Sequence, residues 1–168
     1  IKIQKNILSF SDLEHFCLKL LADENRQKSD IARSISEQFD EIMIDEYQDI
    51  NEVQDAIFRL VSRDEQNIFM VGDVKQSIYR WRGSDWKLLN SSIPEEFPGH
   101  HEEVLDTNYR SLSNVVDFNN LFFRSAASIL DSMNGSEEGG PLTDIYSDVK
   151  QLVGKKASAK GSVSLTFC

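Results

Sequence analysis

The 168-residue sequence has only two cysteines, Cys17 and Cys168, and their spacing fits no metal-binding pattern. Cys17 falls on the apolar side of an expected helix, which is typical of a small core residue. This cysteine usage favours a reducing compartment, so we expect a cytoplasmic protein.

Long apolar runs are also missing. No stretch approaches the roughly 18–20 residues that a membrane-spanning helix needs. No basic segment followed by an apolar core opens the chain, so no secretory signal is recognisable. Because the sequence starts at Ile1 rather than Met, we expect it to be a piece of a longer protein.

Positive charge is scarce. Eighteen Lys and Arg residues stand against 28 Asp and Glu residues, which gives a formal net charge of -10. This argues against broad, charge-driven binding of nucleic acid but allows a narrow groove in which a few cations act locally. The composition, 40% hydrophobic and 27% charged, is that of a soluble globular protein with one core or one core and part of a second.

The first part of the chain predicts helices and buried strands in alternation. Ser11 and Glu14 have capping-box spacing, and one helical face follows them at Leu13, Phe16, Cys17, Leu20 and Leu21. A second helix is expected over about 24–38. Apolar strands at 41–45 and 67–73 flank a helix at 51–61. This order predicts an α/β fold with a parallel sheet that is covered on both faces.

A break at 93–101 contains two prolines and a glycine, and a second α/β domain is expected from near residue 100. It would hold a strand at 102–106, a long helix through Val115 and Ile129, and a last strand at 163–167. Loops are expected at 134–140 and 155–162.

Two carboxylates, Asp45 and Glu46, follow the strand at 41–45. Ligands of such sheets gather at the carboxyl ends of the strands. In phosphoryl transfer one carboxylate can hold Mg²⁺ and a second can orient or deprotonate water. Acids also favour helix N-termini without any catalytic role, and the residues alone leave both readings open.

Cations and aromatic rings interleave after the next strand. The segment 71–87 contains Lys75, Tyr79, Arg80, Trp81, Arg82, Trp86 and Lys87. Single-stranded nucleic acid is held by bases stacked on aromatic rings while cations follow the backbone, and each stacked base is worth roughly 1–3 kcal/mol. Core tryptophans with arginines that extend to the surface are an equally open reading.

Arg110 follows the expected strand at 102–106. An arginine from a neighbouring domain can neutralise charge on a transferring γ-phosphoryl group, which raises the rate by on the order of 10³–10⁵. A lone surface arginine is the alternative.

Three stretches, "IDEYQD", "VGDVKQSIYRWRGSD" and "LDTNYRS", occur in one order, each after an expected strand. They resemble motifs II, III and IV of superfamily 1 DNA helicases of the UvrD/Rep/RecB type, over roughly residues 40–125. "FSDLEHFCLKLL" and "GSVSLTF" resemble the RecB- and AddA-type helicase–nuclease subunits.

The resemblance implies an ATP-dependent DNA helicase with two RecA-like motor domains, the first in part at 1–98 and the second beginning at 99–168. It implies that Asp45 binds Mg²⁺, Glu46 activates water and Gln76 senses the γ-phosphate of ATP. It further implies that single-stranded DNA contacts Tyr79, Trp81 and Arg82, that Tyr109 stacks on the nucleotide base, and that Arg110 reaches the γ-phosphate. Gln48, Asp49 and Asp73 match the motifs in supporting positions.

The sequence departs from this family in one respect, because it contains no G-x-x-x-x-G-K-[ST] loop to cradle phosphates. We therefore expect an interior slice of the parent, with no ATP hydrolysis above background by itself, a partner subunit in the parent, and dimers of the slice through an exposed strand edge. Two alternatives stay open: a metal-dependent nuclease using Asp45, Glu46 and Asp49, and a non-catalytic binding module.

Overall fold

The computed structural model describes residues 7–79, 81, 83–85, 87–89, 93–97, 99–133, 141–154 and 160–167. The chain divides into two compact units, Ile1–His100 and His101–Cys168. Each unit combines helices with a small parallel sheet, which is compatible with the predicted α/β class. None of the helices formed by the described residues is long and apolar enough to cross a membrane.

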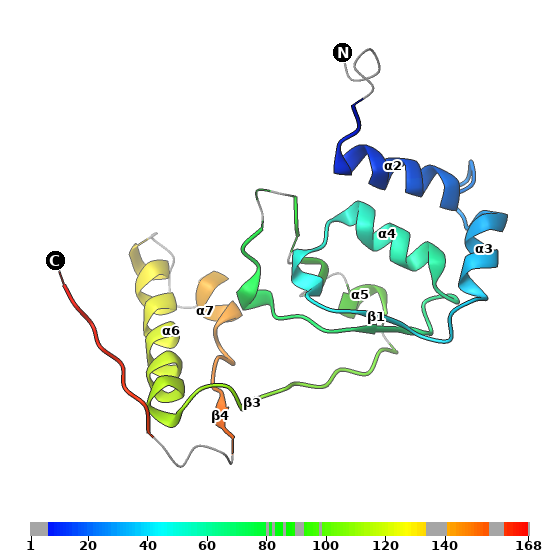
Figure 1. Ribbon diagram of the computed structural model, residues 1–168. Helices are drawn as coiled ribbons and strands as arrows, with labels where there is room; N and C mark the ends of the chain where they lie inside the picture. The colour runs from blue at the N-terminus through cyan, green and yellow to red at the C-terminus, as the bar shows by residue number, and fades with distance from the viewer. Residues whose placement is uncertain are drawn as a thin grey trace. The chain divides into compact units, whose positions relative to one another are not determined.

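Unit 1 is a strand–helix–strand arrangement with further helices packed on it (Figure 1). Its helices are α2 (Phe10–Leu21), α3 (Asp30–Ser36), α4 (Glu52–Val61) and α5 (Ile93–Glu96), and its strands are β1 (Ile42–Ile44) and β2 (Ile68–Met70). β1 and β2 pair in parallel, with Ile42 opposite Ile68, so the predicted β–α–β order is confirmed. Short 3-10 turns, η1 (Tyr47–Asp49) and η2 (Val74–Gln76), follow the two strands.

The start of α2 differs from the prediction. Its capping box is formed by Ser9 and Asp12, not by Ser11 and Glu14. The Glu14 carboxylate instead accepts hydrogen bonds from Asn51 Nδ2 at 3.4 Å and Gln54 Nε2 at 2.7 Å, both at the start of α4. Glu14 thus joins α2 to α4, and a local pattern cannot reveal such a distant partner.

The core of unit 1 lies on one face of the sheet. Ile44, Tyr47, Ile50 and Ile93 are buried there, and residues of α4 and α5 pack around them. Met43 and Phe69, which point to the opposite side of the pleat, are more than half exposed. The prediction of a sheet covered on both faces is therefore wrong for the described residues, because their helices bury only one side.

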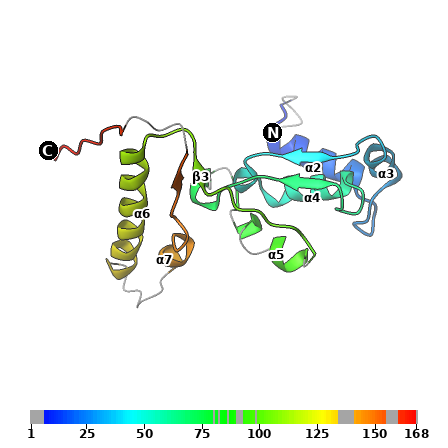
Figure 2. The same cartoon turned by 90° about the horizontal axis from the view of Figure 1, so that it is seen from below.

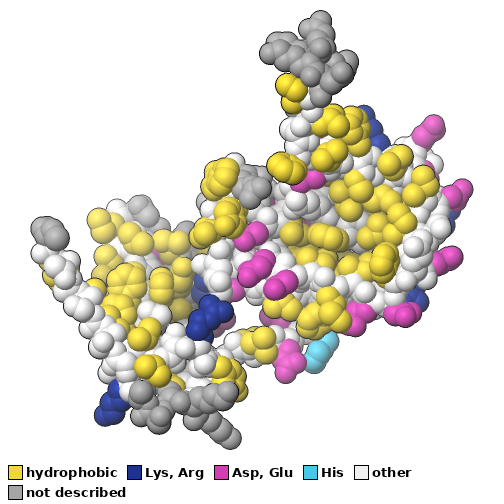
Figure 3. Space-filling model, in the orientation of Figure 1, with side chains coloured by type: hydrophobic (Ala, Val, Ile, Leu, Met, Phe, Trp, Pro, Cys, Tyr) yellow, Lys and Arg dark blue, Asp and Glu magenta, His cyan; other side chains and the backbone are white. Residues whose placement is uncertain are grey.

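The predicted apolar face of α2 is also largely uncovered. Leu21 is buried and Cys17 is half-buried, whereas Leu13, Phe16 and Leu20 are exposed. α2 packs against α3 and α4 through its other residues. Figure 3 shows hydrophobic side chains over much of the viewed face of unit 1.

Unit 2 is built on a long helix, α6 (Ser113–Met133), with α7 (Pro141–Ile145) and strand β4 (Leu152–Val153) beside it in both views (Figures 1 and 2). β4 pairs in parallel with β3 (Thr107–Asn108). Asn120 of α6 holds this pairing in place, because its side chain bonds both the N–H and the C=O of Gln151.

Two strands expected in unit 2 are absent from the described residues. Residues 101–106 are exposed and belong to no ladder, since the strand begins at Thr107. The segment 163–167 is likewise unpaired. The position beside β3 is taken by β4, whose two residues are too few to give a strand pattern in the sequence. The expected break at 93–101 contains the short helix α5, and the expected second helix is confined to α3.

Candidate functional site

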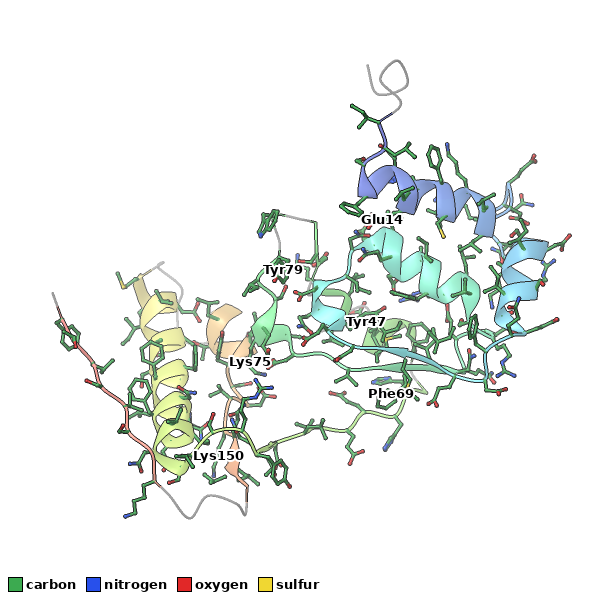
Figure 4. The ribbon with its side chains drawn as sticks, in the orientation of Figure 1. Glu14, Tyr47, Phe69, Lys75, Tyr79 and Lys150 are labelled. Carbon is green, nitrogen blue, oxygen red and sulfur yellow. The ribbon has the colours of Figure 1, made fainter. Side chains whose placement is uncertain are left out.

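The carboxyl ends of β1 and β2 meet at one edge of the sheet, where the two motif-bearing segments begin. Val71 N donates to Ile44 O at 2.8 Å, and Tyr47 N donates to Val71 O at 3.0 Å. These bonds bring the residues after β1 beside the residues after β2. Figure 4 labels Tyr47, Lys75 and Tyr79 on these segments.

Asp45 and Glu46 both expose their side chains at this edge. Glu46 adopts the left-handed conformation, with φ 54° and ψ 43°, and its N–H donates to Asp45 Oδ1 at 2.9 Å. A non-glycine residue in this region costs about 1–3 kcal/mol and tends to occur at functional sites. The strained turn directs the chain from β1 into η1 and leaves two adjacent carboxylates at the sheet edge.

Gln48 connects the two segments through hydrogen bonds. Its Nε2 donates to Glu46 Oε2 at 2.7 Å, and its Oε1 accepts from Asp73 N at 3.0 Å. Asp73 Oδ2 in turn accepts from Gln76 Nε2 at 3.0 Å. The structure therefore joins Glu46 and Gln76 through two intermediate residues. Lys75 Nζ lies 3.6 Å from Asp73 Oδ1.

Asp49 is the third acid of this segment. Its Oδ1 is buried and has no hydrogen-bond partner among the described residues. Burial, and then the negative charge of Glu46, raise the pKa of the Asp49 carboxyl. Within the described residues no three or more His, Cys, Asp or Glu side chains gather closely enough to hold a metal ion. The direct nuclease reading with Asp45, Glu46 and Asp49 is therefore not favoured.

Tyr79 and Trp81 lie on the surface. Trp81 is 79% exposed, so the reading that places it in the core is wrong. The two ring centroids are 6.3 Å apart and the rings are inclined by 58°, so each ring offers a separate face. Arg82, which the sequence assigned to the same surface, lies outside the described residues, as do Arg80 and Trp86.

In unit 2, Tyr109 and Arg110 follow β3 directly. Both side chains are exposed, and Tyr109 is 73% accessible. Asn108 Oδ1 accepts from the N–H of Arg110 at 2.9 Å and of Ser111 at 2.8 Å, which closes a tight turn. A Cβ at Gly154 would lie 2.6 Å from Tyr109 Cδ1, so the Tyr109 ring packs where a side chain at 154 would stand.

A buried network beneath the edge was not expected from the sequence. The Tyr47 hydroxyl donates to Asp55 Oδ1, and Arg59 Nε donates to Asp55 Oδ2 at 2.8 Å. The Arg59 guanidinium also lies 4.6 Å from the centre of the Phe97 ring. Burial, and then the Asp55 carboxylate, raise the pKa of Tyr47, so its hydroxyl stays protonated and donates. No sequence spacing marks this set.

Residues 2–97 match the model of the UvrD/REP helicase N-terminal domain, which is more than half of the chain. The chain belongs to the UvrD/REP helicase family. The carboxylate edge and the exposed rings of unit 1 therefore lie in the part of the chain that this family model covers.

Several relatives carry the name of an ATP-dependent helicase/nuclease, each as its A subunit. The protein from Moorella thermoacetica is 47% identical over 141 residues, which are 77% of this chain and 10% of the relative. That from Pediococcus pentosaceus is 41% identical over 155 residues, or 90% of this chain and 12% of the relative. That from Bacillus pumilus is 42% identical over 135 residues, or 73% and 11%. The UvrD/REP helicase chain thus spans about a tenth of the length of the curated relatives it matches.

Proposed function

We propose that this chain is part of an ATP-driven DNA helicase or translocase that moves on single-stranded DNA. The parent would be a helicase–exonuclease subunit that works in DNA repair and recombination. The observation that carries the proposal is the short connected path at the edge of unit 1, from Glu46 through Gln48 and Asp73 to Gln76, followed within a few residues by the exposed rings of Tyr79 and Trp81.

The carboxylate edge suits the hydrolytic role. Mg²⁺ is commonly bound by one or two carboxylates together with phosphate oxygens, and the exposed Asp45 carboxylate is of this kind. When bound there, Mg²⁺ would neutralise charge on the phosphates of ATP. Glu46 would orient or deprotonate the attacking water, and Gln76 would sense the γ-phosphate.

Tyr79 and Trp81 would contact single-stranded DNA, and Arg82 would add a cation to that contact. Two stacked bases would contribute about 2–6 kcal/mol, which corresponds to a dissociation constant near or weaker than about 0.1 mM. A weak grip suits a protein that must release DNA at every step.

Tyr109 and Arg110 would complete nucleotide recognition, with the ring stacked on the base and the guanidinium on the γ-phosphate. Their exposure directly after β3 supports this assignment. On this proposal unit 1 is part of the first RecA-like motor domain, with the boundary at about 98–99, and unit 2 begins the second.

Binding of a fluorescein-labelled oligo-dT, followed by fluorescence anisotropy, tests the DNA contact. We expect weak binding that weakens further as salt is raised. Trp81→Ala should reduce the affinity by about 5- to 150-fold, which is the loss of one stacked base. Trp81→Phe is the matched control, because it keeps an aromatic face and should retain most of the affinity. Equal binding by wild type and Trp81→Ala would contradict the proposal and favour the non-catalytic module.

Three further properties follow from the proposal. The chain by itself should hydrolyse ATP at no more than background, because its sequence has no phosphate-binding loop. The parent would be cytoplasmic and would have a partner subunit, since the relatives are named as one subunit of an enzyme. The isolated chain would form dimers, since β1 and β2 pair only with each other among the described residues. Light scattering that gives a monomer at high concentration would contradict the last point.

A further inference from the structure

Gln48 is the most deeply buried polar side chain at the carboxylate edge, with 1% of its surface exposed. Its amide group is used at both ends, since Nε2 donates to Glu46 and Oε1 accepts from the backbone of Asp73. A buried amide that is bonded on both sides has one orientation and holds both partners in register. Glu46 therefore cannot shift without changing the bond to the segment after β2.

Gly72 provides the space for this contact. A Cβ at position 72 would lie 2.9 Å from Gln48 Oε1 and 2.8 Å from Leu89 Cδ2, both closer than side chains normally approach. The backbone of the segment after β2 can come within hydrogen-bond distance of Gln48 because residue 72 has no side chain. The approach of the two segments is thus built into the sequence at both positions.

A second bond leads from Gln48 toward the exposed rings. Ser77 Oγ donates to the backbone C=O of Gln48 at 3.2 Å. Ser77 stands two residues before Tyr79 and four before Trp81, at the end of η2. A displacement of the ring-bearing segment would therefore act on Gln48 at its backbone, and Gln48 would transmit it to Glu46 through its side chain.

We propose that Gln48 is a positioning residue that couples the Tyr79–Trp81 surface to the Glu46 carboxylate. It fixes the Glu46 side chain for work on water, and the Ser77 bond makes that geometry depend on the segment that carries the rings. This inference rests on the proposed function, because it assigns the route by which bound DNA stimulates ATP hydrolysis.

The test measures steady-state ATP hydrolysis by the full-length protein that contains this chain, with and without oligo-dT. Gln48→Met has a similar length but removes both side-chain bonds. We expect kcat in the presence of oligo-dT to fall by about 10–100-fold, as for other residues that orient a catalytic group. KM for ATP should change by less than about twofold, because Gln48 contacts no nucleotide. Gln38→Met, the same substitution at an exposed position, is the control.

Two further variants distinguish positioning from a loss of stability. Ser77→Ala should reduce the ratio of stimulated to unstimulated hydrolysis by about two- to tenfold, since it removes one neutral hydrogen bond. Gln48→Glu keeps the acceptor for Asp73 N but places a second carboxyl beside Glu46. One of two adjacent carboxyls has a raised pKa, and its protonated form can donate again. Its hydrolysis should therefore recover as the pH is lowered from about 8 to 6, relative to wild type.

The outcomes separate the inference from the function on which it rests. If wild type shows no hydrolysis stimulated by oligo-dT, the proposed function fails and the coupling with it. If wild type is stimulated and Gln48→Met stays within twofold of it, the inference alone is wrong. Should Gln48→Met fail to fold, an unchanged stimulation ratio in Ser77→Ala together with an unchanged pH profile in Gln48→Glu overturns the inference.

Discussion

Replacement of Tyr47 by phenylalanine would test the buried network that supports the carboxylate edge. The Tyr47 side chain is fully buried, and its ring packs with Ile44, Ile50 and Ile93. Phenylalanine keeps this packing and removes only the hydroxyl that donates to Asp55. Because Asp55 is 8% exposed, water cannot replace the lost donor freely.

The magnitude follows from the kind of bond that is lost. A hydrogen bond to a charged group contributes about 1.5–3 kcal/mol. The Asp55 carboxylate keeps its bond from Arg59 Nε at 2.8 Å, so we expect a loss of stability within this range and no collapse of the fold. For a unit of about 100 residues, each kcal/mol lowers Tm by about 4 °C or more, so Tm should fall by at least about 6 °C.

Urea and thermal unfolding at pH 7, followed by circular dichroism, would measure the effect. Tyr109→Phe is the matched control, because it removes the same hydroxyl from an exposed ring and should change stability by less than about 0.5 kcal/mol. In an Asp55→Ala background the sign should change: Tyr47→Phe should be neutral or stabilising, since it then removes a buried hydroxyl without its acceptor. A Tyr47→Phe protein as stable as wild type would refute the reasoning.

Two more predictions concern unit 2. Burial acts to raise the pKa of Asp131, but hydrogen bonds from Thr143 and Leu142 outweigh it and lower that pKa, so this carboxylate stabilises the fold above about pH 4 and ceases to do so as the pH falls through its folded pKa. Asp131→Asn should therefore lower Tm at pH 7 and differ progressively less from wild type below about pH 4, and a pH-independent difference would contradict this. Gly154→Ala should displace the Tyr109 ring and destabilise unit 2 by about 1–3 kcal/mol, whereas Gly99→Ala, which meets no atom within 4 Å, should be neutral in the same unfolding assay.

The order of elements in unit 1 could be read from the sequence because it depends on local patterns. The apolar runs at 41–45 and 67–73 indicated β1 and β2, and the helical period between them indicated α4. Residues that follow parallel strands must emerge at one edge, so the proximity of the Asp45–Glu46 pair to the segment after β2 also follows from the sequence. The three motifs indicated the helicase family, and the family model confirms it.

Burial was less predictable. The same periodicity predicted a buried face on α2, yet Leu13, Phe16 and Leu20 are exposed. A periodic apolar pattern says that a face can be buried, but which face is covered depends on the elements available to cover it. Unit 1 contributes helices to one side of its sheet only, so Met43 and Phe69 also remain at the surface.

Local sequence patterns were enough to locate the core strands and helices of unit 1, the acids and rings that follow them, and the family of the chain, because each depends on neighbouring residues. Tertiary folding was needed to bring Gln48 to Asp73, 25 positions away, and to place Glu14 against the start of α4 instead of in the cap of its own helix. Likewise, β4 became the partner of β3 because Asn120 holds Gln151 beside it. Hydrogen bonds between distant residues depend on how the chain reverses and in which register its segments meet, and no local spacing records that.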